Sequence, residues 1–241
     1  MAPMAIAGAW LVAVAAQVTG NAAMLHHHAL IEGDSPLWVA LPVFLVGWQV
    51  MIAAMMLPAS LPAIGDFNAG VSRLAQPRRA RTAFLGSYTL VWTIFGLLAF
   101  LGDVVLHRVV DATPWLAARP WLIEASVLGL AGAYQLTPHK RRSLEACRHP
   151  ALQPPSTSQP QRGPFQLGLD HGLACLAASW ALMLLIFAEG FASLGWMIAL
   201  TAAMAYETTG RHGLRGAAAL GVLLLQFSAV ILLVGWRTTL V

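Results

Sequence analysis

Two cysteines, and a histidine close to one of them, are the residues of this sequence best suited to chemistry. Cys147 and Cys175 are the 2 cysteines of the chain, and His171 precedes Cys175 by four positions. Residues four apart share one face of a helix. Thiolate and neutral imidazole are good ligands for zinc or copper. These residues therefore predict a transition-metal site, with copper as the expected ion.

Further donors lie at the ends of other apolar segments. Met51, Met55 and Met56 share one side of a predicted helix, and thioethers suit Cu(I). Glu207 closes another apolar segment and is expected to complete a set of three or four ligands. Methionine also fills gaps in hydrophobic cores, so a packing role for these side chains is the alternative.

The histidine and the cysteines have structural alternatives as well. His171 can cap or hydrogen-bond at a helix start, and Cys175 can be a small buried residue. A disulfide between Cys147 and Cys175 is less expected, because both cysteines lie on the side predicted to face a reducing cytosol.

A second set of possible ligands is predicted at the opposite ends of the helices. Asp103 and His107 are four apart, and Glu124 and Glu189 interrupt long apolar segments. Acids at membrane depth are costly and are usually paired or functional. The histidines at 26–28 cannot all face one point on a regular helix. We predict a weaker, outer metal site from these residues.

The amino-acid composition indicates the class of protein in which both predicted sets of metal ligands lie. Only 10% of the 241 residues are charged, against about 25% in an average soluble domain. Apolar types make up 58% of the chain, and the mean hydropathy is +0.69. Such a chain is not a soluble globular protein, a disordered tail or a disulfide scaffold. The basic residues lie in short segments rather than in a stripe, which argues against nucleic acid as a partner.

Apolar runs then predict the helices that position these residues. A membrane helix needs about 20 mostly apolar residues. Runs with at most one charge cover 1–25, 35–65, 83–102, 121–137, 172–206 and 216–236. The run 172–206 is long enough for two short helices, divided at Glu189 and Gly190. The first run lacks the basic start of a signal peptide and is taken as a span. The sequence therefore predicts about seven spans.

Basic residues predict the orientation. With a cytoplasmic N-terminus, the segments after spans 2, 4 and 6 hold four, five and two basic residues, which places 11 of the 14 inside. The expected fold is all-α, a polytopic transmembrane helix bundle that forms a single domain over 1–241. Residues 139–168 are expected to form a cytoplasmic Pro-rich loop, since five prolines between 150 and 164 argue against regular structure.

Three stretches resemble a known family. They are WQVMIAAMMLPASLP at 48–62, AYQLTPHKRRSLEACRHP at 133–150 and HGLACLAASWALMLLIFAEGFASLGWMIALTAAMAYE at 171–207. Together they are similar to an uncharacterised bacterial family of predicted metal-binding integral membrane proteins, from span 2 to span 6. The resemblance implies metal binding and a multi-pass location in the bacterial inner membrane. In the predicted topology all three stretches converge on the cytoplasmic face.

The chain departs from the pattern of that family at two places. The family usually has a cysteine where this chain has Ser143. It also has a cysteine cluster where Ala177, Ala178 and Ser179 follow Cys175 here. The thiolate-rich site that the resemblance implies is therefore reduced to Cys147 and Cys175.

Three functions are compatible with these observations. The first is an integral membrane metal-binding or metal-handling protein for copper. The second is a non-catalytic accessory subunit, with partner subunits in the lipid bilayer and no nucleic acid. The third is a membrane metalloenzyme, because Asp103 and His107 resemble the Asp-x-x-x-His element of copper-dependent membrane monooxygenases. Pro120 occupies the place of the second histidine of that element.

Overall fold

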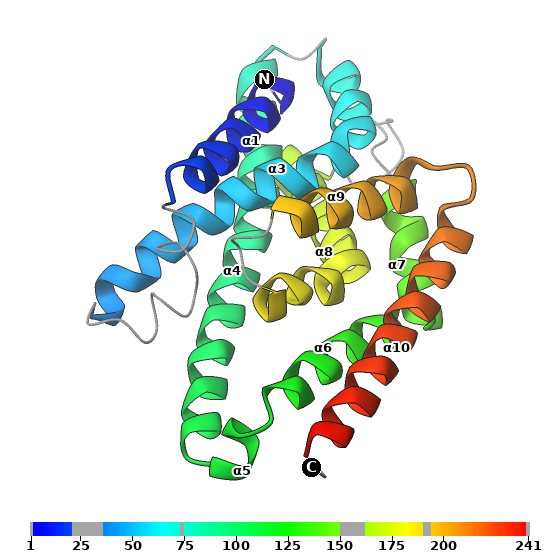
Figure 1. Ribbon diagram of the computed structural model, residues 1–241. Coiled ribbons are helices and arrows are strands. Elements are labelled where there is room, and N and C mark those ends of the chain that lie inside the picture. Colours follow the sequence, from blue (N-terminus) through cyan, green and yellow to red (C-terminus); the bar gives the residue numbers. More distant parts are fainter. Residues whose placement is uncertain (1, 21–35, 73–74, 150–161, 190–193, 240–241) are drawn as a thin grey trace.

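The computed structural model describes residues 2–20, 36–72, 75–149, 162–189 and 194–239, and the regular structure in these ranges is helical (Figure 1). The helices are α1 (Ala2–Val18), α3 (Leu37–Val71), α4 (Pro77–Asp111), α5 (Pro114–Ala117), α6 (Pro120–Gln135), α7 (Pro138–Arg148), α8 (Pro164–Glu189), α9 (Leu194–Thr209) and α10 (Gly213–Thr238). The all-α prediction is confirmed. The histidines at 26–28 and most of the Pro-rich segment lie outside the described residues.

Four of the described helices are long and apolar enough to cross a membrane. They are α3, α4, α10 and the Pro164–Ile186 part of α8. The predicted division of the long run near Glu189 is also found, since α8 ends at Glu189 and α9 begins at Leu194. The total of seven spans and the cytoplasmic N-terminus stay predictions.

A short helix stands where the sequence predicts the start of a loop. Helix α7 covers Pro138–Arg148 and α8 begins at Pro164, so both ends of the segment predicted as a loop, 139–168, are helical. Its start is well defined, because the Thr137 hydroxyl accepts a hydrogen bond from the Lys140 backbone N–H at 3.1 Å and proline occupies the first helical position. The dense prolines begin only at residue 150, beyond the end of α7.

Helix α3 continues through three prolines, Pro42, Pro58 and Pro62. A proline has no N–H to donate to the carbonyl four residues earlier. For Pro58 that carbonyl belongs to Ala54, and the Trp10 indole N–H of α1 donates to it at 3.1 Å. A neighbouring helix thus satisfies a carbonyl that proline leaves free, as apolar surroundings require.

Glycines let α8 lie close to α4 at the centre of the bundle (Figure 1). A Cβ atom at Gly168 would lie 2.2 Å from the Phe84 carbonyl oxygen, and one at Gly172 would lie 3.1 Å from Val91. Small residues four apart permit such close approach of membrane helices. Helices α6 and α10 use the same device, because a Cβ atom at Gly132 would meet the Gly221 carbonyl oxygen at 2.8 Å.

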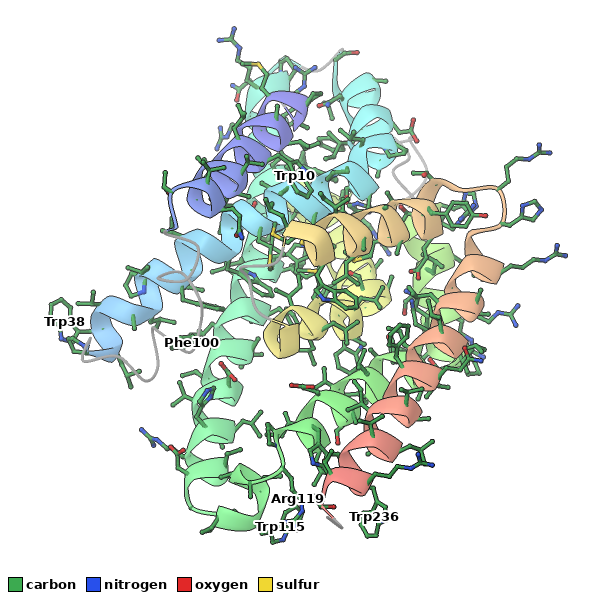
Figure 2. All side chains as sticks on the ribbon, in the orientation of Figure 1. Trp10, Trp38, Phe100, Trp115, Arg119 and Trp236 are labelled. Carbon is green, nitrogen blue, oxygen red and sulfur yellow. The ribbon has the colours of Figure 1, made fainter. Side chains whose placement is uncertain are left out.

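Tryptophans near helix ends differ in their exposure. Trp38, Trp115 and Trp236 are exposed, and Figure 2 shows Trp115 and Trp236 together at the end of the molecule that holds α5 and the C-terminus. Trp10 instead packs against the core and donates its hydrogen bond to α3. The exposed group matches aromatic residues at a membrane–water interface.

Candidate metal centre

Helix α7 presents one buried face to the bundle, and Cys147 is part of it. Its buried residues are Lys140, Leu144 and Cys147, at the spacing of one helical face. The other side of α7 carries exposed charged residues. The amphipathic pattern therefore turns the Cys147 thiol inward, where 4% of the residue is exposed.

Helix α8 supplies the second cysteine. The close packing of Gly168 and Gly172 on α4 brings Cys175, one turn further along α8, next to Tyr88. The Cys175 sulfur lies 3.6 Å from the Tyr88 hydroxyl and 3.9 Å from the Ser60 hydroxyl. Ser60 and Tyr88 also contact each other at 3.2 Å. Two hydroxyl groups from α3 and α4 thus surround a sulfur of α8.

The two cysteines meet as free, buried thiols. The neighbouring Cys175 thiol, together with burial, raises the pKa of Cys147 well above its ordinary value. The positive charge of Lys140 opposes that rise in part. Cys147 is therefore a thiol at neutral pH, and a metal that binds its sulfur must displace a proton.

The sulfur cavity is a small space of about 10 Å³ between α3, α7, α8 and α9, with room for roughly one water-sized atom. Its lining brings together two thiols and two thioethers: Met56, Ala59, Leu144, Cys147, Cys175, Ala178, Ser179, Met204, Glu207 and Thr208. The Ser179 hydroxyl donates to the Met56 sulfur at 3.6 Å and to the Cys175 carbonyl oxygen at 2.7 Å. Met55 is equally buried but does not line this cavity.

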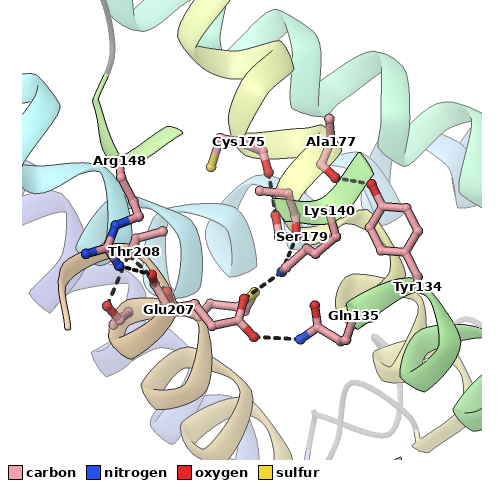
Figure 3. Close-up of polar contacts among 12 residues, drawn as sticks. Tyr134, Gln135, Lys140, Arg148, Cys175, Ala177, Ser179, Glu207 and Thr208 are labelled. Atoms are coloured by element: carbon pink, nitrogen blue, oxygen red, sulfur yellow. Dashed lines mark hydrogen bonds and ion pairs between the residues drawn. The ribbon is translucent and has the colours of Figure 1, made fainter. Parts of the chain in front are cut away.

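Glu207, which lines the sulfur cavity, forms a buried ion pair with Lys140 (Figure 3). The Lys140 ammonium lies 2.6 Å from one carboxylate oxygen of Glu207. The Gln135 amide donates to the other oxygen at 2.5 Å, and Lys140 also donates to the Ala178 carbonyl. Both carboxylate oxygens of Glu207 are thus engaged in the protein, although Glu207 lies where the sequence placed it, beside the cysteines.

Two further contacts hold the same helices together (Figure 3). The Arg148 guanidinium at the end of α7 donates to the carbonyl oxygens of Glu207 and Gly210, the latter at 2.9 Å. The Tyr134 hydroxyl of α6 donates to the Ala177 carbonyl of α8. Helices α6, α7, α8 and α9 are therefore fixed around the two cysteines by polar contacts.

His171 lies one turn before Cys175 on α8 but does not line the sulfur cavity. Its ring stacks between Phe84 and Tyr88, with centroid distances of 6.1 and 5.7 Å. The residue is 2% exposed, and neither ring nitrogen has a hydrogen-bond partner within the described part of the chain. A buried imidazole without a hydrogen-bond partner is rare and needs a functional or structural reason, and the role of a metal donor predicted for His171 supplies one.

The predicted outer residues are brought together only in part. The His107 ring contacts the Asp103 backbone oxygen at 2.9 Å and its carboxylate at 3.4 Å. Glu124 is exposed on α6, and the Glu189 side chain lies outside the described side chains. Over the described ranges, no three or more His, Cys, Asp and Glu side chains are grouped so that they could hold one metal ion.

Sequence reasoning missed several side chains of this centre. Lys140, Gln135 and Arg148 belong to the stretch 133–150 that carries the family resemblance, and a lysine beside an apolar segment was a usable signal for a partner of Glu207. Ser60 and Tyr88 gave no such signal, because single hydroxyl residues in apolar helices usually serve packing or helix contacts.

A family model described as PpoB2, copper chaperone, matches residues 45–231. That range contains Met56, Cys147, His171, Cys175 and Glu207. No curated protein and no solved structure matches the chain significantly.

Proposed function

The chain belongs to the PpoB2 family of copper chaperones, and we propose that its cargo is Cu(I), held by Cys147, Cys175 and Met56. The observation that carries this proposal is the meeting of two free thiols, from α7 and α8, in one buried cavity with the Met56 thioether. Soft thiolate and thioether ligands select Cu(I). We place this site in a multi-pass protein of the bacterial inner membrane.

The donor set favours Cu(I) over zinc. A structural zinc site takes four ligands from cysteine, histidine and carboxylate side chains. Among the described residues, no three such side chains lie where they could share one ion. Cu(I) accepts fewer ligands and accepts methionine sulfur, so two cysteines with Met56 satisfy it. Met204 lines the same cavity and adds a second thioether.

The Lys140–Glu207 pair supports the proposed site without binding the ion. Copper binding converts thiols to thiolates and adds negative charge to a buried region. The Lys140 ammonium acts on Cys147 electrostatically, and a nearby cation stabilises a thiolate. Because both Glu207 oxygens are engaged, we assign Glu207 to holding Lys140 in place.

His171 fits a role in transfer. It shares a helix face with Cys175, and its ring contacts Tyr88, whose hydroxyl contacts the Cys175 sulfur. A buried imidazole with two unpaired nitrogens gains a partner when an ion approaches. We therefore propose that His171 binds copper briefly as the ion enters or leaves the sulfur cavity, and that an acceptor protein in the membrane receives it.

Titration of the purified protein with Cu(I) under reducing, oxygen-free conditions tests this proposal. With a colorimetric Cu(I) chelator as competitor, we expect one tightly bound ion per chain. The Cys147→Ser, Cys175→Ser double variant should lose this ion, because a hydroxyl group is a poor Cu(I) ligand. Tight binding retained in the double variant would refute the assignment.

Two adjacent methionines provide a matched control. Met55 and Met56 are both buried in α3, but only Met56 lines the sulfur cavity. We expect Met56→Leu to weaken Cu(I) binding by about tenfold, while Met55→Leu leaves it unchanged, because each exchange conserves volume. Equal effects of the two exchanges would show that the thioether is not a ligand.

A further inference from the structure

A second, open pocket lies beside the sulfur cavity and has a different chemistry. It forms where the end of α7 meets the turn between α9 and α10, and its lining is basic: Glu145, Arg148, His149, Arg211, His212, Gly213, Leu214 and Arg215. Three arginines against Glu145 give a formal charge of +2 with both histidines neutral. The pocket therefore repels a bare metal cation and attracts an anion.

Hydrogen bonds to the backbone hold one arginine of this pocket, Arg148, in place. Arg148 donates to the carbonyl oxygens of Glu207 and Gly210, which ties α7 to the turn after α9. Gly213 permits this arrangement, because a Cβ atom there would lie 2.1 Å from the Glu207 oxygen and 2.2 Å from the Arg148 guanidinium. The pocket is thus built around one anchored arginine.

The guanidinium groups of Arg211 and Arg215 instead remain available to bind an anion. Both are exposed, and neither pairs with an acidic side chain in the described part of the molecule. Figure 2 shows nitrogen-tipped side chains that extend from the turn between α9 and α10 away from the bundle. Guanidinium groups bind phosphate in a bidentate manner, so these two residues can clasp one phosphate group.

The position of the pocket at the end of an apolar helix indicates that the phosphate belongs to a lipid headgroup. Arg215 lies in the first turn of α10, which has the highest hydropathy of the candidate spans. The half-exposed Tyr206 packs against Gly210 and Gly216 at the same level. Exposed tyrosine at the end of an apolar helix marks the headgroup region, and exposed apolar residues such as Val222 and Leu223 follow along α10.

We propose that this pocket binds the phosphate of an anionic membrane lipid, with Arg211 and Arg215 as ligands and the acyl chains along α10. Basic pockets between helices bind lipid headgroups in this way. Because Arg148 follows Cys147 directly and bonds to the backbone of Glu207, the lipid binds against the same contacts that position α7. The proposal needs the membrane location but does not depend on copper binding.

Lipid exchange into the full-length protein tests this proposal. The wild-type chain is placed in nanodiscs of phosphatidylcholine with or without phosphatidylglycerol, and retained lipid is counted by native mass spectrometry. We expect phosphatidylglycerol to be retained selectively. In the Arg211→Gln, Arg215→Gln double variant that preference should fall about 25-fold, because each arginine that binds the lipid headgroup contributes a factor of about five.

A matched pair at the other end of α10 gives the control. Arg119 lies over the Trp115 ring and Arg237 follows Trp236 in the sequence, and Arg119→Gln, Arg237→Gln should leave the preference intact. The proposal is overturned if both double variants lose the preference for phosphatidylglycerol equally. It is equally overturned if both variants keep that preference. It is also overturned if inorganic phosphate displaces the lipid at equal concentration, since the pocket would then select phosphate rather than a lipid.

Discussion

At the scale of single residues, the surroundings of the Cys175 sulfur distinguish it from an ordinary buried cysteine. Hydroxyl groups of Ser60 and Tyr88 and the thiol of Cys147 approach it from three other helices. Hydrogen bonds to a sulfur favour its anionic form, which is the form that binds metal. The centre is thus arranged around Cys175.

The sequence predicted the sulfur donors but not their surroundings. Cys147, Cys175 and Met56 could be named because their residue types suit copper and because the predicted topology places them on one side of the membrane. Ser60 and Tyr88 lie 115 and 87 positions from Cys175. Such contacts follow from how α3 and α4 pack on α8, and no local pattern encodes that packing.

His171→Leu separates a transfer residue from a structural one. The exchange removes two buried, unpaired nitrogens and loses the stacking with Phe84 and Tyr88. We expect the copper-free protein to gain about 1 kcal/mol in its free energy of unfolding, since an unsatisfied buried polar group costs about 1–3 kcal/mol. Copper transfer to a chelator should become slower, while the affinity of the sulfur cavity stays the same.

Thermal unfolding in mild detergent and stopped-flow copper release are the two measurements. His139→Leu serves as the control, because His139 is exposed at the start of α7 and should change neither quantity. A destabilised His171→Leu variant would contradict the assignment, since it would show that the imidazole is held by favourable contacts in the copper-free protein.

At the scale of elements, α7 decides whether the second cysteine reaches the site. The charged residues and prolines that follow one another from residue 139 predict a loop there. The capping residue Thr137 and the pattern Lys140, Leu144 and Cys147 instead produce a short amphipathic helix. Its inward face was hard to predict because one of its three buried residues is a lysine.

The Lys140–Glu207 pair should behave as a buried ion pair that fixes α7 against α9. We expect Lys140→Met alone, or Glu207→Gln alone, to lower the free energy of unfolding by about 3–5 kcal/mol, because each leaves an uncompensated buried charge. The double variant should recover most of this loss, since neutral residues of similar size replace the pair. Thermal unfolding of the four proteins in a double-mutant cycle gives the coupling energy.

Two outcomes of the double-mutant cycle would contradict the roles assigned to Lys140 and Glu207. If the effects of Lys140→Met and Glu207→Gln simply add, the two charges do not act as a pair. If the double variant folds and still binds Cu(I) as tightly as the wild type, Lys140 does not help to stabilise thiolates in the sulfur cavity.

At the scale of the whole molecule, the shortage of charge predicted the fold class directly. Few charged residues favour a surface that faces lipid rather than water, and four described helices are long and apolar enough to cross a membrane. Helices α1, α6 and α9 have 17, 16 and 16 residues, below the usual span of about 20. Composition therefore defines a helical bundle, whereas the number of spans depends on helix lengths and tilts.

The two proposed sites lie together at one end of the bundle. Cys147 and Arg148 are consecutive, yet the first lines the sulfur cavity and the second lines the basic pocket. The outer pair Asp103 and His107 belongs to the last turns of α4, away from both. The molecule thus concentrates its soft metal donors and its anion-binding groups around α7.

The most direct test of the central claim is X-ray absorption at the copper edge of the loaded protein. The proposed site predicts Cu(I) with a first shell of sulfur only, from the two thiolates and Met56. Cys175→Ser should remove sulfur from that shell, whereas Met55→Leu should leave the spectrum unchanged. A first shell of nitrogen and oxygen, or a spectrum unaffected by Cys175→Ser, would contradict the assignment of copper to the sulfur cavity.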